Sequence, residues 1–245
     1  MIRERAFVAD LHLHPGAPGL TACFLELIGT RLAPGTELYV LGDLFDAWIG
    51  DDDDTPAYRE VVAGLAAATA RGLDVRIQRG NRDFLIGTRF ARETGCRLLA
   101  DEEVIELGGK RTLLLHGDTL CTGDRAYQSL RRQLRDPAWQ RHFLALPLAE
   151  RRRRAAGLRA ASTEATRDKP EDVMDASPAA VRSAFETHRV ERIIHGHTHR
   201  PACHRGEGPG GGEERRVLPD WRRSGHVLRW GAEGPRSEEI PPPPG

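Results

Sequence analysis

The sequence predicts an α/β fold, and three observations support this class. Strand-length apolar segments recur along the chain, and most of them end in Gly, Asp or Asn. Helix-length segments separate the early strands, and such alternation is typical of sheets covered by helices. Hydrophobic residues make up 39% of the 245 positions, which is enough to bury a sizeable core.

The expected elements follow in chain order. Strands are predicted over 6–11, 37–45 and 73–81, and helices over 21–32 and 58–72 lie between them. Residues 103–118 read as a hairpin, because two apolar runs flank the pair Gly108-Gly109, which suits a tight turn. Two further strands are expected over 192–199 and 226–230.

Three segments depart from this pattern. Residues 124–167 are helix-like and rich in arginine, so we predict a domain over 1–232 with a helical insertion at about 122–170. The Gly-rich stretch 204–216 is predicted to be a loop. Residues 233–245, which end in four prolines and a glycine, are predicted to form a disordered tail.

Composition narrows the possible functions. The formal net charge is zero, so no overall field favours a nucleic-acid partner. The four cysteines lie far apart, which argues against a disulfide framework and fits a reducing, cytoplasmic compartment. The N-terminus turns polar within ten residues, unlike a signal peptide, and no apolar run reaches the roughly 20 residues of a spanning helix. We therefore expect a protein that is soluble or lies on a membrane.

Polar side chains follow five of the predicted strands. The motifs are Asp10-Leu11-His12, Gly42-Asp43, Gly80-Asn81-Arg82-Asp83, His116-Gly117-Asp118 and Gly196-His197-Thr198-His199. In open α/β sheets the carboxyl ends of the strands are where ligands bind. A glycine before Asp43, Asn81 and His197 allows a tight turn and a close approach to a ligand.

These motifs supply two Asp, one Asn and four His as candidate metal ligands. Oxygen and imidazole ligands without thiolate suit Mn²⁺, Fe or Zn²⁺ rather than Ca²⁺. Seven ligands exceed the needs of one ion, whereas two ions that share Asp43 would use them all. A two-metal site lowers the pKa of a bridging water and clamps an in-line displacement, so we expect hydrolysis at phosphorus.

The series D-x-H, G-D, G-N-x-D, H-G-D, G-H-x-H resembles the calcineurin-like metallophosphoesterases. More narrowly, "LGDLFDAWIGDDD", "GNRDFLIG", "LLHGDTLCTGD" and "IIHGHTHRP" are similar to the UDP-2,3-diacylglucosamine hydrolase family of lipid A biosynthesis. The resemblance runs from about residue 6 to 230. It implies a β-sandwich flanked by helices, with the insertion as a helical cap.

The resemblance also implies roles for individual residues. One of two Mn²⁺ ions would be held by Asp10, His12, Asp43 and His199, and the other by Asp43, Asn81, His116 and His197. The implied substrate is a UDP-linked diacylated sugar, cleaved to UMP and the sugar 1-phosphate by attack of an activated water on the α phosphorus. Catalytic residues would be Asp43, Asn81, Arg82 and His116, and substrate contacts would be Asn81, Arg82, Asp124, Ser162, Thr166, Lys169 and His197.

Arg82 stands where most of the superfamily carries a histidine that protonates the leaving group. An arginine side chain stays protonated in proteins and cannot serve as a general acid. A phosphate leaving group, split from a diphosphate, is already a stable anion and needs no proton. Arg82 can instead neutralise charge on the transferring phosphoryl group.

Several neighbouring residues allow two interpretations. Asp83 and Asp118 either orient a ligand or loop, or cap a turn, and His195 is interpreted as a hydrogen-bonded core histidine rather than a third ligand. The acidic run Asp51–Asp54 is interpreted as a solvated loop without chemistry.

The insertion also leaves two readings open. Its apolar residues either pack at helical spacing or line a cleft for acyl chains. The run Arg151–Arg154 is either a solvated face or a contact for an anionic membrane. The resemblance to the hydrolase family implies that this membrane would be the inner membrane, on its cytoplasmic face.

Two rival functions remain at this point. A generic phosphatase or nuclease could use the same metal core, although a nuclease should show a basic, aromatic-lined groove and aromatic residues are only 6% of this chain. A catalytically silent scaffold is the second rival. It is disfavoured because none of the seven ligand positions is lost.

Overall fold

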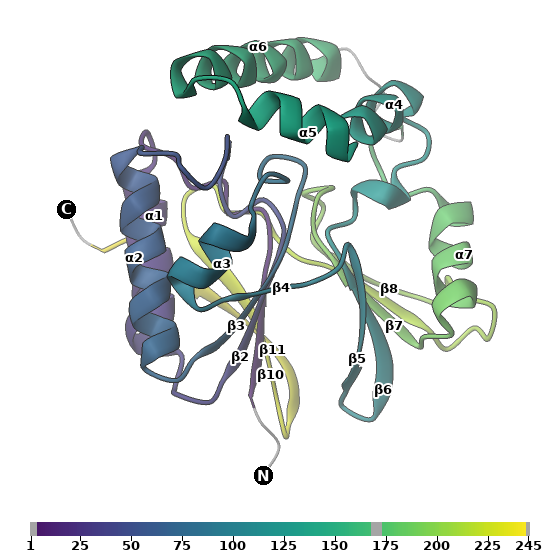
Figure 1. Cartoon of the computed structure of the whole chain (residues 1–245). Helices are drawn as coiled ribbons and strands as arrows, with labels where there is room; N and C mark the ends of the chain where they lie inside the picture. The colour runs from purple at the N-terminus through teal and green to yellow at the C-terminus, as the bar shows by residue number, and fades with distance from the viewer. Residues whose placement is uncertain (1–3, 168–172, 244–245) are drawn as a thin grey trace.

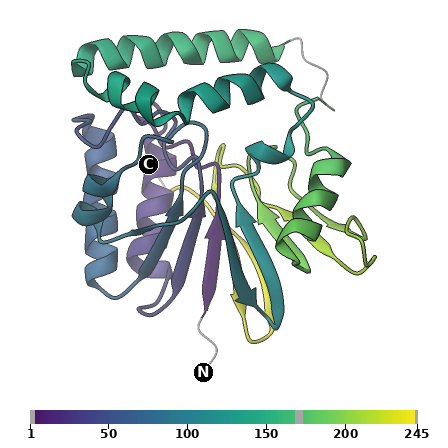
Figure 2. The same cartoon turned by 45° about the vertical axis from the view of Figure 1, so that its right-hand side comes forward.

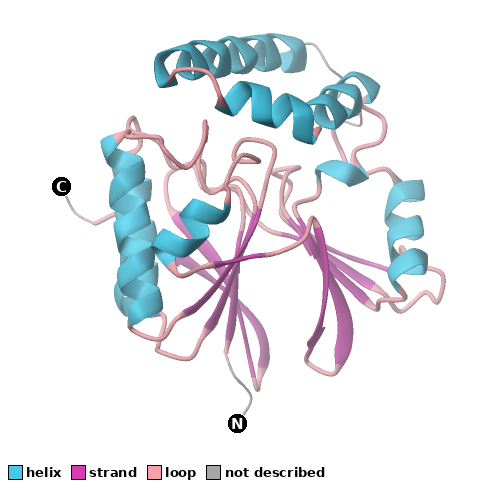
Figure 3. Cartoon of the chain, viewed as in Figure 1, coloured by secondary structure: helices cyan, strands magenta, loops and turns pink. Residues whose placement is uncertain are grey.

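The computed structural model describes residues 4–167 and 173–243, and within helix α6 it leaves out the side chains of residues 162, 163 and 165–167. Figure 3 shows two β-sheets in the middle of the molecule with helices on their outer sides. The predicted sandwich flanked by helices is confirmed.

Each sheet combines parallel and antiparallel strands. The first sheet has the strand order β11 (Gly234–Ile240), β10 (Gly225–Gly231), β1 (Arg5–Val8), β2 (Glu37–Leu41), β3 (Asp74–Gln78) and β4 (Arg97–Leu98). The second has the order β5 (Glu102–Leu107), β6 (Lys110–Leu115), β7 (Arg192–His195), β9 (Glu214–Val217) and β8 (Ala202–Arg205). The predicted hairpin is present as β5 and β6, and Gly108 and Gly109 both have positive φ.

Apolar side chains form three packed layers. Between the sheets, Phe7 and Tyr39 of the first sheet stack on each other and join Leu114 and Ile194 of the second in one cluster. The outer face of the first sheet packs against α1 (Pro18–Glu26), its π-helical continuation Leu27–Arg31, α2 (Pro56–Ala70) and α3 (Thr88–Thr94). The outer face of the second packs against α7 (Pro178–His188). Both sheets are therefore buried on two faces over much of their length, which explains their short continuous apolar runs.

The arginine-rich insertion forms three helices, α4 (Arg125–Leu134), α5 (Pro137–Leu144) and α6 (Leu148–Arg167), which we call the helical cap. Asp124 and Asp136 start α4 and α5 by accepting hydrogen bonds from backbone amides three residues on. Figures 1 and 2 show the cap above one end of both sheets, the end opposite to where the chain enters β1.

The acidic run holds the cap to the core, so its interpretation as a solvated loop holds only for Asp52 and Asp54, whose side chains are 46% and 71% exposed, and is wrong for Asp53, which is 2% exposed. Asp52 forms a bidentate pair with Arg151, whose side chain is only 3% exposed, and Asp53 and Asp54 pair with Arg152. Asp51 accepts hydrogen bonds from the backbone amides of residues 87 and 90 at the start of α3. The two charged runs meet because the cap folds back over the loop that follows β2.

Two predictions about the C-terminal part need correction. The disordered tail predicted for 233–245 is wrong for Gly234–Ile240, which pairs along its length with β10 as strand β11. Charged side chains on an edge strand resemble those of a disordered segment, but Ile240 is fully buried and Glu238 pairs with Arg229. The predicted loop 204–216 is also shorter, because β8 and β9 take its two ends.

Candidate metal centre

The five sequence motifs meet at one end of the sandwich. Asp10, Asp43, Asn81, His116 and His197 lie directly beyond β1, β2, β3, β6 and β7. The first three strands are mutually parallel, and β6 is parallel to β7, so their carboxyl ends point the same way. This is the end that the helical cap covers (Figure 2). The predicted ligands therefore come from both sheets and converge in loops.

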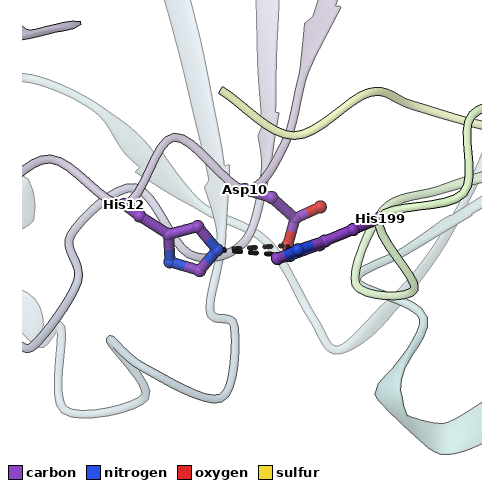
Figure 4. A group of neighbouring side chains, drawn as sticks. All are labelled: Asp10, His12 and His199. Atoms are coloured by element: carbon purple, nitrogen blue, oxygen red, sulfur yellow. Dashed lines mark hydrogen bonds and ion pairs between the residues drawn. The ribbon is translucent and has the colours of Figure 1, made fainter. Parts of the chain in front are cut away.

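A first group of side chains surrounds Asp10 (Figure 4). The Nε2 atoms of His12 and His199 are 3.3 Å apart, and the Asp10 Oδ1 atom lies 3.6 Å from His199 Nε2 and 4.0 Å from His12 Nε2. The Oδ2 atom of Asp43 is 3.9 Å from His12 Nδ1. Asp10, His12 and His199 thus lie within reach of one ion, whereas Asp43 faces the other ring nitrogen of His12.

A second group is tighter. The Oδ1 atom of Asn81 lies 2.9 Å from His116 Nε2 and 3.0 Å from His197 Nδ1, and these two nitrogens are 3.2 Å apart. Asp43 Oδ1 is 3.8 Å from His116 Nε2. Asp43 therefore directs one oxygen to each group, as a bridging carboxylate would.

The donor atoms suit a bound cation. His116 Nδ1 lies 2.9 Å from the carbonyl oxygen of Leu41 and must donate to it, so in the neutral ring Nε2 presents a lone pair to Asn81 Oδ1. Without a metal, a proton on Nε2 bridges the two atoms; with a metal in place of that proton, both atoms can bind the same ion. Ligand atoms of one ion lie roughly 3 Å apart when metal–ligand distances are about 2.1 Å.

Unpaired buried atoms point to the same conclusion. Asp10 Oδ1 and His12 Nδ1 are both buried without a hydrogen-bond partner among the described residues. An unpaired buried carboxylate oxygen is costly. A divalent cation at the first group would satisfy Asp10 Oδ1, which faces the Nε2 atoms of His12 and His199.

The electrostatics of the centre favour cations. Burial opposes the protonation of His116, but Asp43, Asp10 and Asp118 outweigh it and raise the His116 pKa to about 9. Burial raises the pKa of Asp43 to about 6. Burial also acts to raise the pKa of Asp10, but the nearby His199 and the charges of His116 and His12 lower it to about 2. The field that attracts a proton to His116 would also attract a metal ion.

The backbone is strained at the centre. In the part of the chain that the structure describes, six non-glycine residues have positive φ, and five of them are predicted metal ligands: Asp10, His12, Asp43, His197 and His199. Such conformations cost of order 1–3 kcal/mol each and persist only where the surroundings enforce them. Their concentration here is typical of a functional site.

Glycines let the ligand loops approach one another. A Cβ atom on Gly80 would overlap the Asp43 carboxylate and backbone nitrogen, and one on Gly196 would overlap the Asp10 carboxylate. Gly42 has a φ of 88° and packs against the His116 ring. The glycines predicted to allow turns thus also make room for a ligand on a neighbouring loop.

Replacing Gly80 with alanine should displace Asp43 and weaken both metal binding and activity, the activity by more than about 100-fold because a ligand moves by ångströms. The measurement is metal content together with initial rate. Gly29→Ala is the control, because a Cβ there meets no atom within 4 Å. Equal activity of the two variants would contradict the steric argument.

Arg82 and Asp83 connect the two halves of the centre. The Arg82 amide donates to Asp43 Oδ1 at 2.8 Å, whereas its guanidinium has no hydrogen-bond or ion-pair partner among the described residues. Asp83 is fully buried and accepts from the amides of Gly80 and Leu44 at 2.7 and 2.8 Å. Asp83 therefore braces the loops that carry Asn81 and Asp43 rather than capping a helix.

Asp118 links the centre to the cap. Its Oδ2 atom accepts hydrogen bonds from the Tyr127 hydroxyl at 2.8 Å and from Arg131 Nε at 2.6 Å, both on α4. The Tyr127 ring centroid is 5.7 Å from that of His197. The cap thus reaches the second ligand group directly.

His195 is fully buried and lies outside both ligand groups. Its Nδ1 atom is 2.8 Å from the Gly196 carbonyl and its Nε2 atom 3.1 Å from Arg215. The interpretation as a hydrogen-bonded core histidine is confirmed.

The predicted substrate contacts are spread over core and cap. Asn81, Arg82 and His197 lie in the centre, and Asp124 caps α4 beside it. Lys169 lies outside the described residues, and so do the side chains of Ser162 and Thr166 on α6. Their roles as substrate contacts stay predictions.

A cleft runs from the centre beneath the cap. Asn81, Arg82, Asp118 and Tyr127 line its end near the metal ligands. The remainder is lined mainly by apolar side chains of core and cap: Trp48, Ile49, Phe84, Leu85, Leu130, Leu134, Trp139, Phe143 and Leu158. Trp139 and Phe143 stack at 5.1 Å, and Phe143 also packs on the core. The cap's apolar residues therefore both pack on the core and line a cleft, and the role of that cleft in binding acyl chains stays a prediction.

Sequence reasoning missed Tyr127, Arg131 and Asp220, which contact the centre from outside its motifs. Tyr127 and Arg131 stand in the helical insertion, and Asp220 follows β9 with its Oδ2 atom 3.3 Å from His199 Nδ1. A Tyr and an Arg spaced four apart on a helix give no sign of a carboxylate in another loop. None of the three has a local pattern that could have revealed it.

Comparison with known proteins places the chain in a family. Residues 5–201 match the family described as calcineurin-like phosphoesterase. Proteins named UDP-2,3-diacylglucosamine hydrolase from Serratia proteamaculans and Xanthomonas axonopodis are 44% and 46% identical, and each alignment covers 96% of this chain and 98% of the relative. A protein of the same name from Escherichia coli O81 is 47% identical, and the alignment covers 91% of this chain and 93% of the relative.

Among solved structures, an archaeal phosphodiesterase aligns over 97% of this chain and 99% of its own, with 10% identity and a TM-score of 0.48. A likeness of that size supports no conclusion about function.

Proposed function

This chain belongs to the calcineurin-like phosphoesterases and, within them, to the UDP-2,3-diacylglucosamine hydrolases, and from that premise we propose that it hydrolyses the pyrophosphate bond of UDP-2,3-diacylglucosamine. The products are UMP and 2,3-diacylglucosamine 1-phosphate, a step in lipid A biosynthesis. One observation carries the proposal: seven candidate ligands of a metallophosphoesterase converge at one end of the sandwich, and one of them, Asn81, lines the end of a cleft whose other walls are mainly apolar.

The metal centre is proposed to hold two divalent ions, with Mn²⁺ preferred and Fe or Zn²⁺ possible. Asp10, His12, Asp43 and His199 would hold one, and Asp43, Asn81, His116 and His197 the other. Bound there, such ions lower the pKa of a water and neutralise charge in an in-line displacement at phosphorus. The unpaired Asp10 Oδ1 atom, which faces the Nε2 atoms of His12 and His199, supports this assignment.

Arg82 and Asn81 are proposed to orient the diphosphate. Arg82 lines the cleft with a guanidinium that has no partner among the described residues, so it can pair with phosphoryl oxygens. Attack on the α phosphorus expels a sugar phosphate, which is stable as an anion. An arginine that neutralises charge therefore suits this leaving group, and no general acid is needed at position 82.

The apolar part of the cleft is proposed to hold the acyl chains. It starts at Arg82 and continues between core and cap, so a sugar whose diphosphate lies at the metal centre would place its acyl groups there. Burying methylene groups against such walls is worth about 0.8 kcal/mol each. A nuclease would instead need a basic, aromatic-lined groove.

Peripheral contact of the cap with an anionic membrane is a further part of the proposal. Arg153 and Arg154 remain 77% and 50% exposed, and Leu144 and Leu158 are exposed on the same cap. Each cation near such a surface contributes about 1 kcal/mol. Among the helices that the structure describes, none combines the length and apolar character that a membrane crossing demands.

The experiment that tests the function measures UMP release from UDP-2,3-diacylglucosamine by the full chain with Mn²⁺, against phosphate release from p-nitrophenyl phosphate. We expect a strong preference for the UDP sugar. In ¹⁸O-labelled water the label should enter UMP, because the α phosphorus is attacked. Label in the sugar phosphate, or faster turnover of the nitrophenyl ester, would contradict the proposal.

The cap offers a matched pair of variants. Leu158 lines the cleft and Leu144 does not, yet the two side chains are 38% and 40% exposed. Leu158→Gln should raise KM for the diacylated substrate roughly fivefold, through the loss of about 1 kcal/mol of apolar contact, whereas Leu144→Gln should not. Glutamine preserves helix propensity in both. The same KM in both variants would exclude this wall of the cleft from acyl binding.

A further inference from the structure

The segment between β9 and β10 lies against the first ligand group. Its backbone is anchored twice: the Leu218 amide donates to the His195 carbonyl at 2.7 Å, and the Trp221 amide donates to the Asp10 carbonyl at 3.0 Å. Trp221 is 2% exposed and packs edge-on against Phe24. Asp220 stands between these anchors, so the backbone that carries it has a defined position next to Asp10.

The carboxylate of Asp220 contacts a predicted metal ligand on the side away from the metal group. Its Oδ2 atom lies 3.3 Å from Nδ1 of His199, while the opposite ring nitrogen, Nε2, faces Asp10 Oδ1 at 3.6 Å. The Asp220 side chain is 11% exposed. Its other partner is Arg222, whose Nε atom is 2.5 Å from the same oxygen and whose side chain is 72% exposed.

This arrangement decides which nitrogen of His199 can bind a metal. A carboxylate beside Nδ1 keeps the proton on Nδ1 and leaves the lone pair on Nε2, the atom that faces Asp10 and His12. It also fixes the rotation of the ring about its bond to Cβ. The backbone carbonyl of Leu41 holds the proton on Nδ1 of His116 in the same way. Each ligand group therefore contains one histidine whose ring is oriented by an acceptor at the nitrogen that faces away from the metal group.

We propose that Asp220 is a positioning residue that orients His199 and thereby strengthens metal binding in the group formed by Asp10, His12 and His199. The inference rests on the proposed two-metal site. Asp220 has no atom in either group of candidate ligand atoms, so it acts through His199.

The test compares Mn²⁺ binding to the wild-type chain, Asp220→Ala, Asp220→Asn and Arg222→Ala by titration calorimetry. Asp220→Ala should weaken one of the two Mn²⁺ sites 10- to 100-fold and leave the other unchanged. Asp220→Asn retains an acceptor oxygen and should fall between Asp220→Ala and the wild type. Arg222→Ala removes only the exposed partner and should bind both ions as the wild type does.

Two results would overturn the proposal. One is wild-type binding of both ions by the Asp220 variants. The other is equal weakening in Arg222→Ala, which would show that the turn rather than the contact with His199 matters. Because binding is measured without substrate, these failures are distinct from failure of the proposed hydrolysis. A wild-type chain that binds no Mn²⁺ would overturn both.

Discussion

Replacing Asp43 with alanine is expected to abolish Mn²⁺-dependent release of UMP, lowering the rate by more than about 1,000-fold, as the loss of a central catalytic group does in other hydrolases. Asp43 directs one oxygen to each ligand group and accepts a hydrogen bond from the Arg82 amide. Its loss should therefore affect both proposed metals and the loop that carries Asn81. His116→Ala should have a similar effect, because His116 Nε2 lies within 3.2 Å of two other candidate ligand atoms.

Asp43→Asn removes the negative charge of the side chain but keeps its shape. The amide keeps an oxygen for the Arg82 hydrogen bond, but it cannot serve as a bridging carboxylate. Burial raises the pKa of Asp43 to about 6, above its usual range, so at pH 7 without metal the ionised carboxylate opposes folding. Mn²⁺ should raise the Tm of Asp43→Asn less than it raises the Tm of the wild type, because the variant lacks a carboxylate ligand.

Thermal melts with and without Mn²⁺, together with UMP release, check both variants. Full activity in Asp43→Ala would contradict the metal centre. Activity loss in Asp43→Asn with an undiminished effect of Mn²⁺ on Tm would show that Asp43 serves the reaction without holding a metal.

Replacing Arg82 with alanine is expected to lower kcat for UDP-2,3-diacylglucosamine by about 100- to 1,000-fold, the usual cost of removing one donor that stabilises charge in the transition state. Arg82→His should recover little of this loss, because a neutral imidazole at neutral pH supplies no fixed charge. Arg82→Lys keeps the charge but not the bidentate geometry, so its activity should be intermediate.

The Arg82 variants carry their own control. The hydrogen bond to Asp43 comes from the backbone amide of residue 82, which every substitution except proline retains. Metal content should therefore match that of the wild type, and the defect should lie in kcat. Diphosphate cleavage unharmed in Arg82→His would refute the argument about charge neutralisation, and a loss of metal would show that the side chain also supports the centre.

The sequence by itself determined the α/β class, the hairpin at Gly108-Gly109 and the strand-end position of all seven candidate ligands. These features are local, because short apolar runs, glycines and the residues that follow a strand act over a few positions. Parallel strands then bring their carboxyl ends to one edge, so the motifs could be assigned to one site before any contact was known.

Only the tertiary structure decided which distant charges meet. Asp52 and Arg151 are 99 residues apart and pair because the cap folds over the loop after β2, although each run alone reads as solvated. Asp220 reaches His199 because β9 and β10 belong to different sheets, and the segment between them crosses the metal end. Strand β11 likewise exists because β10 offers it an edge. Such contacts depend on which distant segments the fold brings together, and residue type and local spacing do not predict this.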